Sequence, residues 1–166
     1  MKYISSTYEI LAWRCMDKSI DENWSNWAIE MLQAGFETEH LAQIIILEKP
    51  LNQFELKWLA DKILNELSLK FNDCKKALLD YASYLMHQAF ENKITFIKAL
   101  SLIKELYLFL DYEYELSEFY ELYHAKIDLE ENGIQFYHQE ATKENIDFII
   151  FEEFSSWLEK YPINYC

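Results

Sequence analysis

The sequence NQFELKWLADKILNEL, residues 52–67, has the apolar spacing of an amphipathic helix. Its apolar side chains recur every three or four positions, and a turn of 100° per residue places them on one face. They are Leu56, Leu59, Ala60, Ile63 and Leu67. Asn52 followed by Glu55 has capping-box spacing and marks where the helix begins. This stretch predicts a helix that buries one side, and it sets the fold class expected for the whole chain.

The same apolar period recurs on both sides of this stretch and predicts an all-α fold. Further helices are expected over residues 6–17, 21–34, 38–47, 73–90, 95–110, 116–131 and 142–159. The chain has two Gly and two Pro, and Gly35, Pro50, Gly133 and Pro162 all fall where the period stops. Residues 134–138 alternate like a strand, but a lone strand has no partner, so a loop is expected. We predict an irregular bundle of about seven to eight helices, with stacked helical hairpins as the alternative arrangement.

Burial and domain organisation follow from the length and composition. The chain has 166 residues, 51% of them hydrophobic, which suits one domain over residues 1–166 with a single core. Residues 95–110 are apolar nearly all round and are expected to form the most buried helix. The net charge of -14 must then lie on the surface of a folded body.

The cellular location is predicted to be the cytoplasm. No stretch approaches the roughly 18 uncharged apolar residues of a membrane span, and no apolar run of a signal peptide follows residues 1–6. Cys15, Cys74 and Cys166 are odd in number, far apart and without a metal-binding neighbour. We expect all three to be free thiols in a reducing compartment.

Catalytic and nucleotide-binding motifs are missing from the sequence. Two glycines cannot build a phosphate-binding loop, and GxSxG, HExxH and CxxC do not occur. The motif ExxH occurs twice, at Glu37 and His40 and at Glu121 and His124. Di-iron helical bundles use two such pairs with two more carboxylates, all facing the interior, but Glu37 is expected in the loop after Gly35. We therefore predict no enzyme, no catalytic residue, no cofactor and no metal site, and keep a metal-binding bundle as the least favoured alternative.

The negative charge is concentrated in the C-terminal part of the chain. Up to Lys104 there are 14 acidic and 12 basic residues, net -2, whereas beyond it there are 15 and 3, net -12. Acidic surfaces also serve solubility, but this one is confined and mixed with tyrosines, which are favoured at interfaces. Such a face attracts a basic protein and repels nucleic acid.

The helix expected over residues 116–131 carries the densest acidic part. On a helical wheel Leu116, Phe119, Tyr120, Tyr123 and Ile127 form an apolar sector, and the carboxylates fall on the opposite side. The predicted partner-binding residues of this exposed stripe and of the segment before it are Asp111, Tyr112, Glu113, Tyr114, Glu115, Glu118, Glu121 and Asp128.

The stretch WAIEMLQAGF, residues 27–36, followed by Leu41 and Ala42 and by the acidic helical second half, gives the chain a resemblance to a known class. The chain resembles the small acidic helical immunity proteins of bacterial polymorphic-toxin and contact-dependent inhibition systems. Those proteins block the basic nuclease-type toxins of their own operon. The resemblance implies an inhibitor that binds a basic cognate toxin, with no membrane or nucleic-acid partner. A helical regulatory or scaffold protein that binds a peptide is the alternative.

Overall fold

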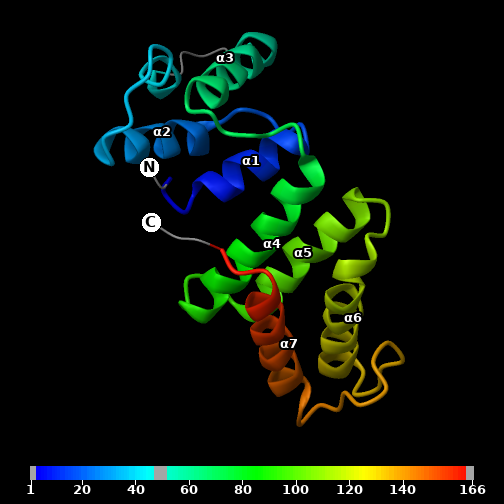
Figure 1. The fold of residues 1–166 in the computed structure, drawn as a ribbon. Coiled ribbons are helices and arrows are strands. Elements are labelled where there is room, and N and C mark those ends of the chain that lie inside the picture. Colours follow the sequence, from blue (N-terminus) through cyan, green and yellow to red (C-terminus); the bar gives the residue numbers. More distant parts are fainter. Residues whose placement is uncertain (1–2, 47–51, 164–166) are drawn as a thin grey trace. The chain divides into compact units, whose positions relative to one another are not determined.

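The computed structural model describes residues 3–46 and 52–163. These residues form seven α-helices, two short 3₁₀ helices and no strand, so the all-α prediction is confirmed (Figure 1). The helices are α1 (Thr7–Cys15), α2 (Glu22–Gln33), η1 (Gln43–Ile45), α3 (Gln53–Glu66), α4 (Cys74–Phe90), α5 (Phe96–Phe109), η2 (Tyr114–Leu116), α6 (Ser117–Glu131) and α7 (Ile146–Lys160). None of the helices in these two ranges combines the length and apolarity that crossing a membrane requires.

The chain divides into two compact units. The first unit covers Met1–Leu78 and the second Leu79–Ile163, so the boundary falls within α4. The single domain over residues 1–166 stays a prediction. The first unit has its own core, in which Trp24 and Trp27 of α2 pack edge to face with ring centroids 6.0 Å apart. The Trp27 indole N–H donates to Thr7 Oγ1 at 3.0 Å, which ties α2 to α1.

The prediction of a helix over residues 38–47 is wrong. The described part of this segment consists of turns and the 3₁₀ helix η1, while residue 47 and Pro50 lie outside the described residues. Thr38 Oγ1 accepts the backbone N–H of Leu41 at 3.2 Å, and the carbonyl of Ile45 accepts from the Ser25 hydroxyl at 3.0 Å. Leu41 and Ile44 are fully buried. A helix in so short a segment is only marginally stable. The burial of Leu41 and Ile44, together with the two hydrogen bonds to the Thr38 and Ser25 side chains, outweighs this marginal stability.

The last helix begins four residues later than predicted. Asn145 closes a local turn: its Oδ1 accepts from the Thr142 backbone N–H at 2.6 Å, and its Nδ2 donates to the Glu140 carbonyl at 2.9 Å. Asn side chains favour such turns over helix interiors. The helix α7 then runs from Ile146 to Lys160 and ends two residues before Pro162. Its buried residues, as predicted, are Ile146, Ile150, Phe154 and Trp157.

The most buried helix is α4 and not α5 as predicted. Residues 81–86 of α4 are all buried in succession, whereas Leu108 and Phe109 at the end of α5 are exposed. An apolar circumference indicates what a helix could bury and does not by itself decide what it does bury. The apolar end of α5 therefore lies on the surface of the second unit.

Several helices are followed by a residue in the left-handed backbone conformation, and only two of these residues are glycines. After α2, Gly35 has φ 85°, its N–H donates to Leu32, and the N–H of Phe36 donates to Met31, which is a Schellman motif. Non-glycine residues take the same conformation elsewhere, namely Asp17, Ser68, Asn92, Asp111 and Tyr112. Gly35 and Gly133 thus close helices as predicted, and a chain with so little glycine accepts strain at its other helix ends.

We predict that Gly35→Ala lowers the free energy of unfolding by about 1–2 kcal/mol, because an L side chain is unfavourable at this φ. A Cβ added at Gly35 meets nothing within 4 Å, so the loss is conformational and not steric. Urea unfolding followed by tryptophan fluorescence measures it. The control Gly35→Asn should lose less, because Asn tolerates the left-handed region. Equal stability of Gly35→Ala and the parent protein would contradict this assignment.

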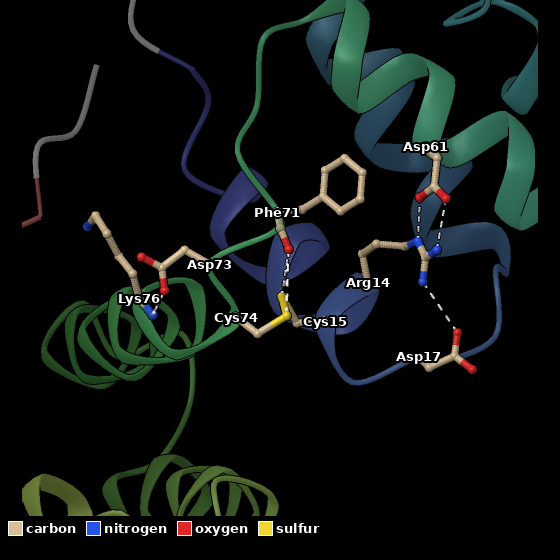
Figure 2. Close-up of a disulfide and its surroundings, with 8 residues drawn as sticks. All are labelled: Arg14, Cys15, Asp17, Asp61, Phe71, Asp73, Cys74 and Lys76. Carbon is tan, nitrogen blue, oxygen red and sulfur yellow. Dashed lines mark hydrogen bonds and ion pairs between the residues drawn. A yellow bond between two sulfur atoms is a disulfide. The ribbon is translucent and has the colours of Figure 1, made fainter.

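The prediction of three free thiols is wrong for two of the cysteines. Cys15 and Cys74 form a disulfide with Cα atoms 5.4 Å apart (Figure 2), and Cys166 lies outside the described residues. The two residues are 59 positions apart in the sequence, and no local spacing reveals such a pair. The bond lies within the first unit and joins the end of α1 to the start of α4.

Candidate functional site: an acidic pocket

The second unit carries most of the protein's net negative charge. It contains 17 acidic and 6 basic residues, net -11, whereas the rest of the chain has 12 and 9, net -3. Figure 1 shows α6 and α7 of this unit side by side, joined by the loop over residues 132–145, and α6 also packs against α5. The densest acidic helix therefore has two helical neighbours.

The inward face of α6 differs from the helical-wheel prediction. Phe119, Leu122, Ala125 and Leu129 are buried, whereas Tyr120, Tyr123 and Ile127 are only half-buried. Tyr120 lies against Tyr107 of α5, with ring centroids 4.9 Å apart. The buried residues occupy one sector of α6 that is rotated from the predicted sector toward Glu118, so the predicted partner-binding carboxylates of α6 are half-buried and do not form one exposed stripe opposite the tyrosines. The prediction of an exposed carboxylate stripe opposite the tyrosines is therefore wrong.

A hollow of about 180 Å³ lies between α6 and α7. Its lining residues are Glu115, Glu118, Phe119, Glu153, Ser156, Trp157 and Lys160, which we call the acidic pocket. Phe119 and Trp157 pack edge to face with ring centroids 5.4 Å apart and form its apolar part. Three carboxylates therefore share a small, partly aromatic hollow with one ammonium group.

A hydrogen-bond chain from α4 positions the pocket. The Ser83 hydroxyl, which is buried, accepts from the Trp157 indole N–H at 2.8 Å and donates to the Tyr161 carbonyl at 3.1 Å. The Tyr161 ring lies 4.3 Å from that of Trp157, and its hydroxyl donates to the Glu115 carboxylate. Trp157 and Glu115 are thus fixed through residues outside the pocket.

Glu118 is the electrostatically unfavourable member of the pocket. Burial raises the pKa of Glu118 above its ordinary value of 4.5, and Glu153 and Glu121 raise it further. His138 opposes this, because its Nε2 lies 3.2 Å from Glu118 Oε1. The raised pKa means that the ionised carboxylate costs free energy in the folded protein. A cation that entered the pocket would recover that free energy.

The other predicted residues do not line the pocket. Asp111 and Tyr112 follow α5 in left-handed backbone conformations, with φ of 55° and 65°. Glu113 precedes η2, and Tyr114 is strongly exposed. Glu121 is half-buried and close enough to Glu118 to raise its pKa, and Asp128 is half-buried farther along α6.

The structure thus brings together Glu115 and Glu118 of the predicted set, with Glu121 beside them. Glu153, Trp157, Lys160 and His138 were missed, because they come from α7 and from the preceding loop. The i, i+4, i+7 spacing of Glu153, Trp157 and Lys160 on one helix face is a signal that could have found these three, whereas no local spacing indicates His138.

The only lysine of residues 111–131 is already neutralised. Lys126 Nζ lies 2.8 Å from both Glu130 Oε1 and Asp147 Oδ1 and so ties α6 to the start of α7. Lys160, which lines the pocket, has its Nζ 4.9 Å from the centroid of the Tyr161 ring. Within the described residues neither lysine forms an ion pair with Glu118 or Glu153, and three carboxylates with one ammonium group leave the pocket negative.

The two ExxH pairs lie in different units. In the second unit, His124 packs among tyrosine rings, and its pKa is lowered by burial and by Lys104. In the first unit, the donor atoms of Glu39, His40 and Glu66 all lie within 4.8 Å of one another. His40 Nδ1 is hydrogen-bonded directly to Glu66. Glu37, the carboxylate of the motif, is not part of this group.

Comparison of the chain with protein-family models, with curated proteins and with solved structures found no match in any of the three. The chemistry of the acidic pocket follows from its own residues. Carboxylates bind ammonium and guanidinium groups by charge-assisted hydrogen bonds, and aromatic faces attract the same cations. The pocket suits the end of a lysine or arginine side chain.

We predict that Glu118→Gln raises the melting temperature at pH 7, because it removes a carboxylate that folding makes harder to ionise. A carboxyl group whose pKa is raised by folding lowers the free energy of unfolding fully at pH values above its folded-state pKa. It has no such effect at pH values well below its ordinary pKa of 4.5. The gain should therefore vanish by pH 4. Thermal unfolding against pH measures it, with exposed Glu152→Gln of α7 as the control. A Glu118→Gln protein less stable than the control at pH 7 would contradict the assignment.

Proposed function

We propose that the protein is an immunity-type inhibitor that acts in the cytoplasm. It binds and neutralises a basic cognate toxin of the nuclease class. The observation that carries the proposal is the convergence of Glu115, Glu118 and Glu153 on a partly aromatic hollow with one ammonium group. The resemblance to immunity proteins points in the same direction. The net charge of -11 in the second unit supplies long-range attraction for such a partner.

A nuclease must present lysine or arginine side chains where its substrate's phosphates bind. In the proposed complex, one of these side chains enters the acidic pocket against Trp157 and pairs with Glu118 and Glu153. The exposed rings of Tyr112 and Tyr114, in the segment before Glu115, add amphipathic contact area. The same acidic face repels nucleic acid, so the inhibitor occupies the substrate site without binding the substrate.

The experiment uses the product of the neighbouring gene, purified as a catalytically inactive variant, and the full-length protein. We predict a stoichiometric complex whose association rate falls steeply between 50 and 500 mM salt, since attraction between unlike charges is screened. Stopped-flow fluorescence measures the rate. An association rate that does not change with salt would contradict the electrostatic role of the second unit.

The pocket itself is tested by two triple variants that remove equal charge. Glu115→Gln, Glu118→Gln and Glu153→Gln together should raise Kd at least tenfold, because truncating one side of a desolvated ion pair is costly. The matched control, Glu144→Gln, Glu152→Gln and Glu159→Gln, changes exposed residues of the same unit and should raise it less than threefold. Equal weakening by both sets would show that net charge, and not the pocket, determines affinity.

The second candidate is a regulatory or scaffold protein that binds a peptide. It is favoured by Phe148 and Phe151, which are 66% and 45% exposed on α7. Binding that depends on these two rings and is insensitive to salt would favour this candidate over the inhibitor. A metal-binding role would rest on Glu39, His40 and Glu66, and metal analysis of the purified protein tests it.

A further inference from the structure

We propose that Cys15 and Cys74 form a reversible redox switch in the first unit. The disulfide joins the last residue of α1 to the first residue of α4 across 59 positions, with Cα atoms 5.4 Å apart (Figure 2). The bond therefore closes a chain segment that includes α2, η1 and α3. This proposal is independent of the acidic pocket, whose residues all lie in the second unit.

The surroundings of the disulfide contain a hydrogen-bond acceptor that the reduced thiols can use. The Phe71 carbonyl oxygen lies 3.3 Å from Cys15 Sγ and 3.6 Å from Cys74 Sγ. A disulfide sulfur has no proton to donate, whereas each thiol of the reduced pair has one. Reduction thus replaces the covalent bond with S–H donation to an acceptor already in place. The Phe71 ring packs against the core of the first unit, which holds this carbonyl near both sulfurs.

The position of Cys74 favours the reduction step. Cys74 is the first residue of the 17-residue helix α4, and Asp73 Oδ1 accepts the backbone N–H of Lys76 at 3.1 Å. The backbone N–H groups at the start of a helix stabilise negative charge, and Lys75 and Lys76 follow directly in the sequence. A reductant that attacks Cys15 Sγ therefore displaces the more stable thiolate. Both cysteine residues are only half-buried, so a small thiol can reach them.

Oxidised glutathione can serve as the oxidant. One protein thiolate attacks it to form a mixed disulfide and releases one glutathione, and the second protein thiolate then displaces the other. One S–S bond breaks and one forms, two electrons pass to glutathione, and the two protein thiol protons end on the two glutathione thiols. An excess of reduced glutathione runs the same steps backwards.

The consequence of the switch is a change in the stability of the first unit. Closing a long loop by a covalent bond restricts the unfolded chain, so the oxidised form unfolds at a higher temperature. Other contacts persist in both states. Arg14, next to Cys15, binds the Asp61 carboxylate of α3 through two nitrogens, with Nη2 2.9 Å from Oδ2. The reduced unit is therefore expected to stay folded and to be less stable.

The test uses the full chain carrying Cys166→Ser, so that only this pair can react. The protein is equilibrated in buffers of reduced and oxidised glutathione, trapped with iodoacetamide and analysed by mass spectrometry and thermal unfolding. We expect a reversible two-electron transition between free thiols and one intramolecular bond. The melting temperature should be higher in the oxidised form by on the order of 10 °C.

The control is Cys15→Ser with Cys74→Ser in the same background, whose melting temperature should match the reduced protein in every buffer. If that variant does not fold, the Cys166→Ser protein alkylated under reducing conditions provides the reduced reference. Three results would overturn the proposal. They are a pair that stays reduced in fully oxidised glutathione, a bond that excess glutathione cannot reduce in the native protein, and equal melting temperatures of the two forms.

Discussion

The Ser83 hydroxyl, 1% exposed within α4, accepts the indole N–H of Trp157 and donates to the carbonyl of Tyr161. The end of α7 is held by this pair of bonds, and so is the apolar part of the acidic pocket. Tyr161 in turn donates to Glu115, which lies in η2 just before α6. A buried hydroxyl or indole left without its partner costs about 1–3 kcal/mol, so these groups fix one arrangement of α4, α6 and α7. The pocket depends on that arrangement, because its walls belong to three separate elements, η2, α6 and α7.

The pocket is electrostatically unfavourable in the free protein. Burial and the neighbouring carboxylates make Glu118 harder to ionise, and His138 compensates only in part. Folding tolerates this because the hydrophobic contacts of Phe119, Phe154 and Trp157 pay for it. Sites that are strained in the free state and relieved by a ligand are common where stability has been given up for function. A basic partner would supply the relief.

Much of the fold could be predicted from apolar spacing, and the failures have physical causes. The period of residues 52–67 and the breakers at Gly35 and Gly133 located helices to within one or two residues. The helix prediction for the segment after Thr38 failed because Leu41 and Ile44 are buried in turns and a 3₁₀ helix. Apolar spacing alone cannot distinguish this arrangement from an α-helix. The prediction of the inward face of α6 failed because it counted Tyr120, Tyr123 and Ile127 on the buried side, whereas the helix buries the adjoining sector, namely Phe119, Leu122, Ala125 and Leu129.

The site could be predicted only in part. Glu115 and Glu118 were found because they lie in the acidic run, but Glu153 and Lys160 reach the pocket from α7, and pairing of helices is not a local property of the sequence. The Cys15–Cys74 bond was missed for the same reason.

The pocket holds more negative charge than its own cations balance. The most direct measurement is an NMR titration of the Glu118 side-chain carboxyl in the free full-length protein, with the assignment checked in Glu118→Gln. We expect the pKa of Glu118 to lie above 4.5, the ordinary value for a glutamate. A pKa of Glu118 at or below 4.5 would contradict it, because the pocket would then already be neutralised and would have no need of a cation from a partner.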